Sequence, residues 1–223
     1  METFPALQVT SPDLALLREN WCWLLSDCQS SDESKHATYL MLAKQYSSKN
    51  RFYHNLHHIA EMIRSIDSVR ERLHNPQSVY LAVWFHDAVY NTRSSDNEEK
   101  SARLAMTEME KLMVPLSNRQ IVEKLILHTK THDPESDAID ADMAVFLDAD
   151  LSILGSSTEL YSQYSKAIRK EYSWVPRILY RTGRKKILES FLTKKRTYIT
   201  DQMAERFEEQ ARTNIAAEIE SLW

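Results

Sequence analysis

Six of the eight histidines in the 223-residue chain fall in three short stretches, at 54–58, at 86 and at 128–132. His86 is followed directly by Asp87, and both come after the apolar stretch Val79–Phe85. An aspartate at the end of such a segment carries a large desolvation cost unless it is paired or bound to a metal. Imidazole with carboxylate is the ligand chemistry of Zn²⁺, Mn²⁺ and Fe²⁺. The doublet therefore predicts a metal site, with one alternative: a core histidine bonded to a backbone carbonyl, beside an aspartate that caps a turn.

His54 and His58 are four residues apart in a segment that the hydrophobic spacing predicts as a helix over 54–73. Residues at this spacing share one face of a helix, about 5–6 Å apart. His57 would then point away, rotated by about 100° around the helix axis. We therefore expect His54 and His58 to act at one site and His57 to lie outside it.

Two further carboxylates, Asp148 and Asp150, interrupt the apolar stretch 146–152. On a helix they point about 200° apart, so at most one of them faces the core. The other is expected to cap a helix or to be solvated. From spacing alone, either could join the histidines.

The elements that must position these residues are all predicted to be helical. The chain has only two Gly and six Pro, which argues against the many tight turns of a sandwich or barrel. Capping and spacing signals predict a single all-α domain over residues 1–223, a helical bundle of eight to ten helices. The predicted helices begin at Ser11 and cover 35–47, 54–73, 76–85, 97–113, 117–128, a short segment to 154 that is closed by Gly155, 157–172, 176–194 and 200–222.

Composition excludes several classes of protein. No run of about 18 apolar residues is present, so no membrane partner is expected, and the N-terminus has no secretory signal pattern. A formal net charge of −4 lacks the positive excess that binding to duplex nucleic acid needs, so no nucleic-acid partner is expected. Cys22 and Cys28 are expected to be reduced thiols, which predicts a cytoplasmic protein. The amphipathic last helix would serve a core or a homodimer interface equally well.

The ordered set of motifs resembles the HD-domain superfamily, and within it the predicted metal-dependent phosphohydrolases of bacteria. The similarity covers roughly 10–220. The stretches that carry it are Tyr-His-Asn-Leu-His-His at 53–58, Val-Trp-Phe-His-Asp-Ala-Val-Tyr at 83–90, Asp-Asn-Glu-Glu at 96–99, Phe-Leu-Asp-Ala-Asp-Leu-Ser-Ile-Leu-Gly at 146–155 and Ile-Arg-Lys-Glu-Tyr at 168–172.

This resemblance implies four metal ligands: His58, His86, Asp87 and Asp150. Asp150 is preferred over Asp148 because the stretch Ala-Asp-Leu-Ser at 149–152 is similar to one in cyclic-nucleotide phosphodiesterases, where that aspartate binds metal. Those enzymes also carry Tyr-His-Asn-x-x-His, whose first histidine is the general acid. The resemblance therefore implies His54 as a catalytic general acid.

The sequence departs from the phosphodiesterases at one position. They have a further histidine three residues after the HD aspartate, where this chain has Tyr90. The departure leaves open whether the ester is a monoester or a diester and whether one or two ions bind. Asp87 is expected to bridge a second ion or to orient the attacking water.

Four other residues are candidates, each with a structural alternative. Glu98 would orient the water, or is an acidic residue at a helix N-terminus. Lys130 and His132 would contact phosphate. In the structural alternative, His128 and Lys130 only interact favourably with the negative C-terminal end of a helix dipole. Arg169 would bind an anionic substrate, or belongs to a solvated helix face.

The sequence thus predicts a metal-dependent phosphohydrolase that attacks a small phosphorylated substrate, such as a nucleotide, with a metal-activated water. The cofactor is one or two divalent ions of Mn, Mg, Zn, Co or Fe. Two alternatives remain: an HD-type di-iron oxygenase that uses His128 and His132, and a non-catalytic sensor of a metal or nucleotide.

Overall fold

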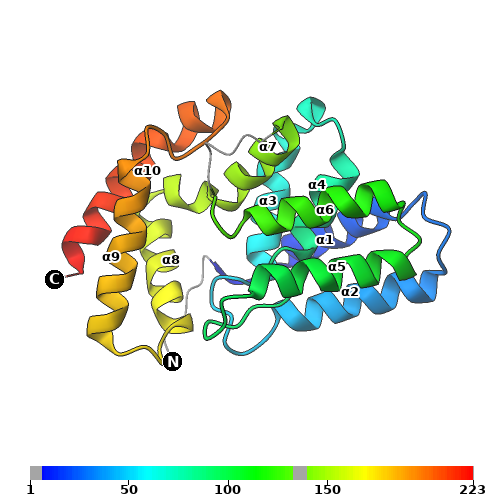
Figure 1. The fold of residues 1–223 in the computed structure, drawn as a ribbon, viewed down its shortest axis with the longest axis horizontal. Helices are drawn as coiled ribbons and strands as arrows, with labels where there is room; N and C mark the ends of the chain where they lie inside the picture. The colour runs from blue at the N-terminus through cyan, green and yellow to red at the C-terminus, as the bar shows by residue number, and fades with distance from the viewer. Residues whose placement is uncertain (1–6, 133–139, 223) are drawn as a thin grey trace.

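The computed structural model describes residues 7–132 and 140–222, and every regular element within these ranges is helical. The prediction of an all-α bundle of eight to ten helices is confirmed (Figure 1). The α-helices of the described ranges are α1 (Ser11–Leu24), α2 (Asp32–Tyr46), α3 (Leu56–Asp67), α4 (Pro76–Phe85), α5 (Asn97–Lys111), α6 (Leu116–His128), α7 (Ala141–Asp150), α8 (Thr158–Glu171), α9 (Arg177–Thr193) and α10 (Asp201–Ser221). Two 3₁₀ turns, η2 (Arg70–Arg72) and η3 (Ser152–Gly155), follow α3 and α7.

Side-chain caps fix where the helices next to the candidate residues begin. Thr10 and Asp13 form a capping box at the start of α1. Asn55 accepts hydrogen bonds from the amides of His57 and His58 and so starts α3. Asn75 caps α4, whose first residue is a proline. These local signals are readable in the sequence, which is why most predicted boundaries agree with the structure.

Helix α4 is the centre of the larger hydrophobic core. Residues 78–85 of α4 are all buried, as expected for a helix that is apolar on every side. This core unites α1 to α7, whereas a second cluster joins α8 and α10 to η3 and Leu188 of α9. Figure 1 shows the two groups side by side, with α8, α9 and α10 at the left and α7 leading towards them.

Two local expectations were wrong. His54 lies before the cap of α3, so it does not share a helical face with His58. The short helix expected to reach 154 ends at Asp150, and Gly155 does not cap it but is the last residue of η3. Its lack of a side chain matters for packing instead, because a Cβ built there would lie 2.5 Å from the Cβ of Phe207.

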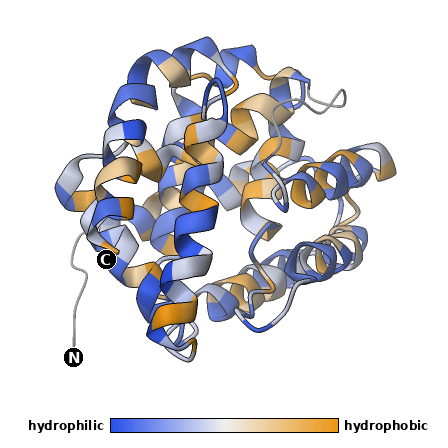
Figure 2. Cartoon of the chain, turned by 60° about the vertical axis from the view of Figure 1, so that its left-hand side comes forward, coloured by the Kyte–Doolittle hydropathy of each residue, from blue (hydrophilic) through white to orange (hydrophobic). Residues whose placement is uncertain are grey.

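Most helices carry both hydrophilic and hydrophobic residues (Figure 2), the pattern of amphipathic helices around a core. Among the described residues, no helix combines the length and the apolar character that a bilayer crossing needs.

Substitution by alanine is expected to change the free energy of unfolding in opposite directions at the two glycines. Gly155→Ala should lower the free energy of unfolding by about 1–3 kcal/mol, because its methyl group overlaps Phe207 of α10. Gly183→Ala should raise it by about 0.5–1 kcal/mol, because Gly183 lies inside α9 and a Cβ there meets no atom within 4 Å. Urea denaturation of both variants beside the parent measures the two changes. Equal effects would contradict the packing role assigned to Gly155.

Candidate functional site

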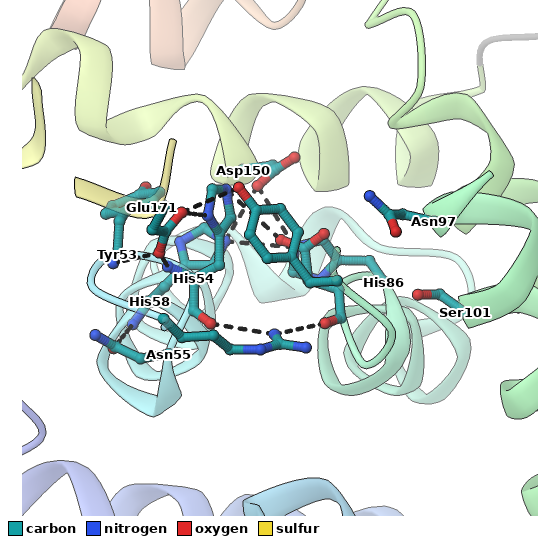
Figure 3. A network of polar contacts seen from close by, with 12 residues as sticks. Tyr53, His54, Asn55, His58, His86, Asn97, Ser101, Asp150 and Glu171 are labelled. Atoms are coloured by element: carbon teal, nitrogen blue, oxygen red, sulfur yellow. Dashed lines mark hydrogen bonds and ion pairs between the residues drawn. The ribbon is translucent and has the colours of Figure 1, made fainter. Parts of the chain in front are cut away.

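Three helix ends bring the four predicted metal ligands together. His58 lies in the first turn of α3, His86 and Asp87 follow the last residue of α4, and Asp150 is the last residue of α7. Figure 3 shows His58, His86 and Asp150 directed towards one another. His58, His86, Asp87 and Asp150 are called the His–Asp cluster below.

His58, His86 and Asp87 have donor atoms within 4.8 Å of one another, and Asp150 lies beside both histidines of this group. His58 Nε2 lies 3.3 Å from His86 Nε2 and 3.2 Å from Asp150 Oδ1. His86 Nε2 lies 3.2 Å from Asp87 Oδ2 and 3.6 Å from Asp150 Oδ1. For ligand distances of about 2.0–2.2 Å, neighbouring donors around one divalent ion lie about 3–3.5 Å apart. The spacing of the cluster matches that requirement.

A hydrogen bond to the backbone fixes the orientation of the His86 ring. Its Nδ1 donates to the carbonyl of Val83 at 3.0 Å, which turns Nε2 towards the cluster. Burial lowers the pKa of both histidines; for His86 the charges of Asp87 and Asp150 outweigh this and raise its pKa to about 9. For His58 burial prevails, and its pKa falls below the ordinary value. The cluster therefore holds one imidazole that favours the neutral form beside one that binds a proton tightly.

The two carboxylates favour the ionised form. Burial opposes the charge on Asp87, but the neighbouring histidines His86 and His54 hold its pKa well below the ordinary value. Asp150 is similarly buried, and hydrogen bonds with His132 and His58 hold its pKa far below the usual range. Two anionic oxygens therefore face the histidines at neutral pH.

His54 is held beside the cluster by Glu171 of α8. Its Nδ1 donates to Glu171 Oε2 at 2.6 Å, and its Nε2 lies 3.9 Å from Asp87 Oδ2. Burial lowers the pKa of His54, but the carboxylates of Glu171 and Asp87 more than compensate and raise it. The Tyr90 hydroxyl also donates to Glu171 Oε2, at 3.0 Å. His54 is thus close to the cluster, as predicted, through a buried carboxylate rather than through helical spacing.

Glu171 also orders the chain that carries His54. Its Oε1 accepts hydrogen bonds from the backbone amides of residues 52, 53 and 54 at 2.7, 2.8 and 3.1 Å. The Glu171 side chain has no exposed surface. Figure 3 shows Glu171 next to His54, on the side away from His86. One buried carboxylate therefore satisfies three amides and orients the imidazole.

Arg51 joins the backbone segments on either side of the cluster. Its guanidinium donates to the carbonyls of His54 at 3.1 Å, of Asp87 at 2.7 Å and of Ala88 at 3.0 Å. Arg51 is buried, and its charge lies over the ring of Tyr46 at 4.9 Å. The arginine thus fixes the position of the segment before α3 relative to the end of α4.

His132 is the predicted phosphate ligand that the structure brings to the cluster. Its Nε2 lies 2.8 Å from Asp150 Oδ2, the oxygen not engaged by His58. His132 has a φ of 44°, a conformation that non-glycine residues adopt rarely and that is enriched at functional sites. Lys194 donates to its carbonyl at 2.9 Å and helps to hold it there.

Three other sequence candidates have structural partners away from the cluster. Asp148 is completely buried and accepts hydrogen bonds from the amides of Ile199 and Thr200, where it caps the start of α10. His57 pairs with Asp13 at 3.0 Å, on the side of α3 expected from its position. His128 bonds to a carbonyl of its own helix. The two aspartates point to different sites, as their spacing predicts: Asp148 is the fully buried one and also the one that caps a helix, whereas the half-buried Asp150 reaches the histidines.

The cluster borders a cavity of about 490 Å³, and of the three remaining candidates one lines this cavity and two do not. Glu98 lines this cavity together with His54, Asp87 and Asp150. Lys130 and Arg169 do not line it. The ammonium of Lys130 contacts Glu99 and the carbonyl of residue 95. Arg169 donates to the carbonyls of residues 172 and 175. The structure therefore gives these two cations partners within the protein.

A second group with metal-ligand chemistry lies on the far side of α3. Asp13, His57 and Glu61 bring donor atoms close together. Arg64, however, pairs with both Asp13 and Glu61, and its guanidinium already supplies the positive charge that an ion would provide. Asp87 and Asp150 of the His–Asp cluster pair with histidines instead, so this cluster is the better metal site.

Sequence reasoning missed the roles of Glu171 and Arg51. Glu171 stands inside the stretch 168–172 that carried part of the resemblance, but no spacing rule links it to His54, 117 residues earlier. Arg51 is one of 28 Lys and Arg residues and carries no pattern of its own. Both act by long-range contacts that only the folded chain shows.

Comparisons with known proteins assign no relative to this chain: no family model, no curated protein and no solved structure matches it.

Proposed function

We propose that the protein is a metal-dependent phosphohydrolase with its ion at the His–Asp cluster. The observation that carries the proposal is the convergence of two imidazoles and two carboxylates at the edge of a cavity, where each histidine Nε2 has neighbouring donor atoms at 3.2–3.6 Å. The sequence resemblance to HD-domain phosphohydrolases supports the same assignment of residues. Free thiols at Cys22 and Cys28 fit a cytoplasmic location.

The donor set suits a hard or borderline divalent ion. Two neutral imidazoles and two carboxylates are ligands for Zn²⁺, Mn²⁺ and Fe²⁺, and Mg²⁺ or Co²⁺ would also accept the oxygens. When bound, such an ion would lower the pKa of a water molecule and offset negative charge on a phosphoryl group. His86 must lose its proton before it can act as a ligand.

The chain's own residues supply the proton chemistry. His54 borders the cavity, and Glu171 favours its protonated form, so His54 is suited to donate a proton from Nε2 to the leaving oxygen. Glu98 is placed at the cavity to accept a hydrogen bond from a water molecule. His132, bonded to Asp150, presents a further imidazole to a phosphoryl group.

The geometry favours this proposal over the di-iron alternative. That alternative required both His128 and His132, but His128 bonds to the carbonyl of Lys124 and does not line the cavity. A pure sensor would not need the buried His54–Glu171 pair beside the cluster. The substrate proposed is a small phosphorylated metabolite such as a nucleotide.

The function is tested by phosphate release. Protein stripped with chelator and resupplied singly with Mn²⁺, Co²⁺, Mg²⁺, Zn²⁺ or Fe²⁺ should release phosphate from at least one mono- or diester in a panel. His86→Ala should lower this rate by at least about 100-fold, because it removes a donor at the centre of the cluster. Circular dichroism checks that the variant is folded. No metal-dependent release from any ester would contradict the proposal.

Metal binding can be tested with two neighbouring aspartates. Asp150→Asn should weaken Mn²⁺ binding by about 10–100-fold, measured by isothermal titration calorimetry, because the amide loses the charge that faces His58. Asp148→Asn is the matched control: it should lower the melting temperature, because it weakens the cap of α10, but should keep the Mn²⁺ affinity. If both variants bind Mn²⁺ equally, Asp150 is not a ligand.

The role of Glu171 predicts a shift in pH dependence. A general acid works while protonated, so the rate falls as pH rises through the pKa of His54. Glu171→Gln removes the charge that raises this pKa, and the alkaline limb of the kcat profile should move to lower pH.

Glu208→Gln provides the control for that shift. Glu208 also accepts hydrogen bonds from backbone amides, those of residues 197 and 198, but it does not contact His54. Its substitution should change stability without moving the pH profile. An unchanged profile in Glu171→Gln would show that the carboxylate is only structural.

A further inference from the structure

The cavity has a second half that the chemistry of the His–Asp cluster does not use. Beyond the cluster its lining is aromatic and aliphatic and comes from α8, α9 and the segment between them. We call this half the apolar wall; its members are Tyr164, Ile168, Tyr172, Trp174, Val175, Leu179, Tyr180 and Ile187. Trp174, Leu179 and Ile187 are exposed, at 43%, 63% and 54%. Large apolar side chains thus remain open to solvent where the cavity leads away from the cluster.

The charges around this cavity do not suit a polyanion. Among its described lining residues, Arg184 is the only arginine or lysine. Its Nε and Nη2 donate to Glu218 at 2.9 and 3.0 Å, so a buried carboxylate neutralises it. Asp87, Glu98 and Asp150 add negative charge at the other end. A second or third phosphate on a substrate would therefore find no unpaired lysine or arginine in this lining.

Two rings of the apolar wall are held in place by neighbouring side chains, two of which, Arg93 and Arg169, lie outside the cavity lining. The guanidinium of Arg93 lies 4.3 Å from the ring centre of Trp174, whose indole nitrogen donates to Thr92 at 2.8 Å. Arg169 lies 4.6 Å from the ring centre of Tyr180. These contacts give the rings fixed positions, which lowers the entropy cost of binding a flat partner.

Gly183 leaves space in the cavity because it has no side chain. It lies within α9, where glycine costs stability relative to alanine, and no neighbour within 4 Å requires the absence of a side chain. It lines the cavity between Tyr180 and Ile187. The missing side chain therefore widens the cavity at the apolar wall, in contrast to Gly155, whose position is fixed by packing.

We propose that the apolar wall binds the organic part of the substrate, and that this part is uncharged and contains an aromatic ring. This proposal rests on the proposed function: the substrate class is a phosphate monoester whose single phosphate lies at the His–Asp cluster and whose ring lies against Tyr172, Trp174 and Tyr180. The monoester brings one charged group to one end of the cavity and a flat neutral group to the other.

The kinetic test compares two primary alkyl esters with similar leaving-group chemistry. Metal-loaded protein should show a KM at least about tenfold lower for 2-naphthylmethyl phosphate than for glycerol 1-phosphate. Gly183→Leu, which fills the space at the apolar wall, should raise the KM for the naphthyl ester about tenfold and leave that for the glycerol ester within about twofold. Equal KM values for the two esters in the parent protein would overturn the proposal.

Thr182→Leu is the matched control, because it adds the same side chain to the neighbouring exposed position outside the cavity lining. It should leave both KM values unchanged. If Gly183→Leu and Thr182→Leu have equal effects, the proposed binding site for the ring is wrong.

A binding measurement separates this proposal from the proposed function. Neutral 2-naphthalenemethanol should bind metal-free protein, seen by saturation-transfer NMR, and Gly183→Leu should weaken this signal while Thr182→Leu keeps it. If no ester is hydrolysed but the alcohol still binds in this way, the proposed function fails and the apolar wall stands. If esters are hydrolysed but the alcohol does not bind, the apolar wall is wrong and the function stands.

Discussion

The structure depends on the crowding of two imidazoles and two carboxylates at one position. His58 and His86 are almost fully buried, Asp87 and Asp150 are half-buried, and neighbouring donor atoms lie only 3.2–3.6 Å apart. Polar groups taken out of water need partners. Val83, His132 and Arg51 supply these from behind and from the sides. The surrounding contacts hold in place a set of groups that would not assemble without them.

All four groups of the cluster lie at helix ends, and this placement explains how segments far apart in sequence can meet. Asn55 fixes the start of α3 just before His58, α4 ends immediately before His86, and α7 ends at Asp150. A helix end allows the chain to turn, so neighbours such as Asp87 can approach the site from the following segment. The hydrophobic core around α4 then fixes the three ends relative to one another.

Sequence reasoning was most successful where local rules apply. The predicted starts at Pro76 and Thr200 agree with the structure, and rotation on a helix correctly separated Asp150 from Asp148. It failed where a contact spans the chain. The nearness of His54 to His58 was expected from helical spacing, but it results from Glu171, and no local signal could reveal that contact.

Helix α8 carries residues that act in both halves of the cavity. Its last residue, Glu171, holds His54 at the His–Asp cluster, while Ile168 and Tyr164, one and two turns earlier, belong to the apolar wall. Tyr164 also receives a weak hydrogen bond from Arg184 of α9 and packs edge-on against Tyr53, the residue before His54. A displacement of α8 would therefore move the imidazole and the wall together. Because both are fixed to one rigid helix, the distance between the group that would donate the proton and the surface that would bind the ring is set by the fold rather than by loops.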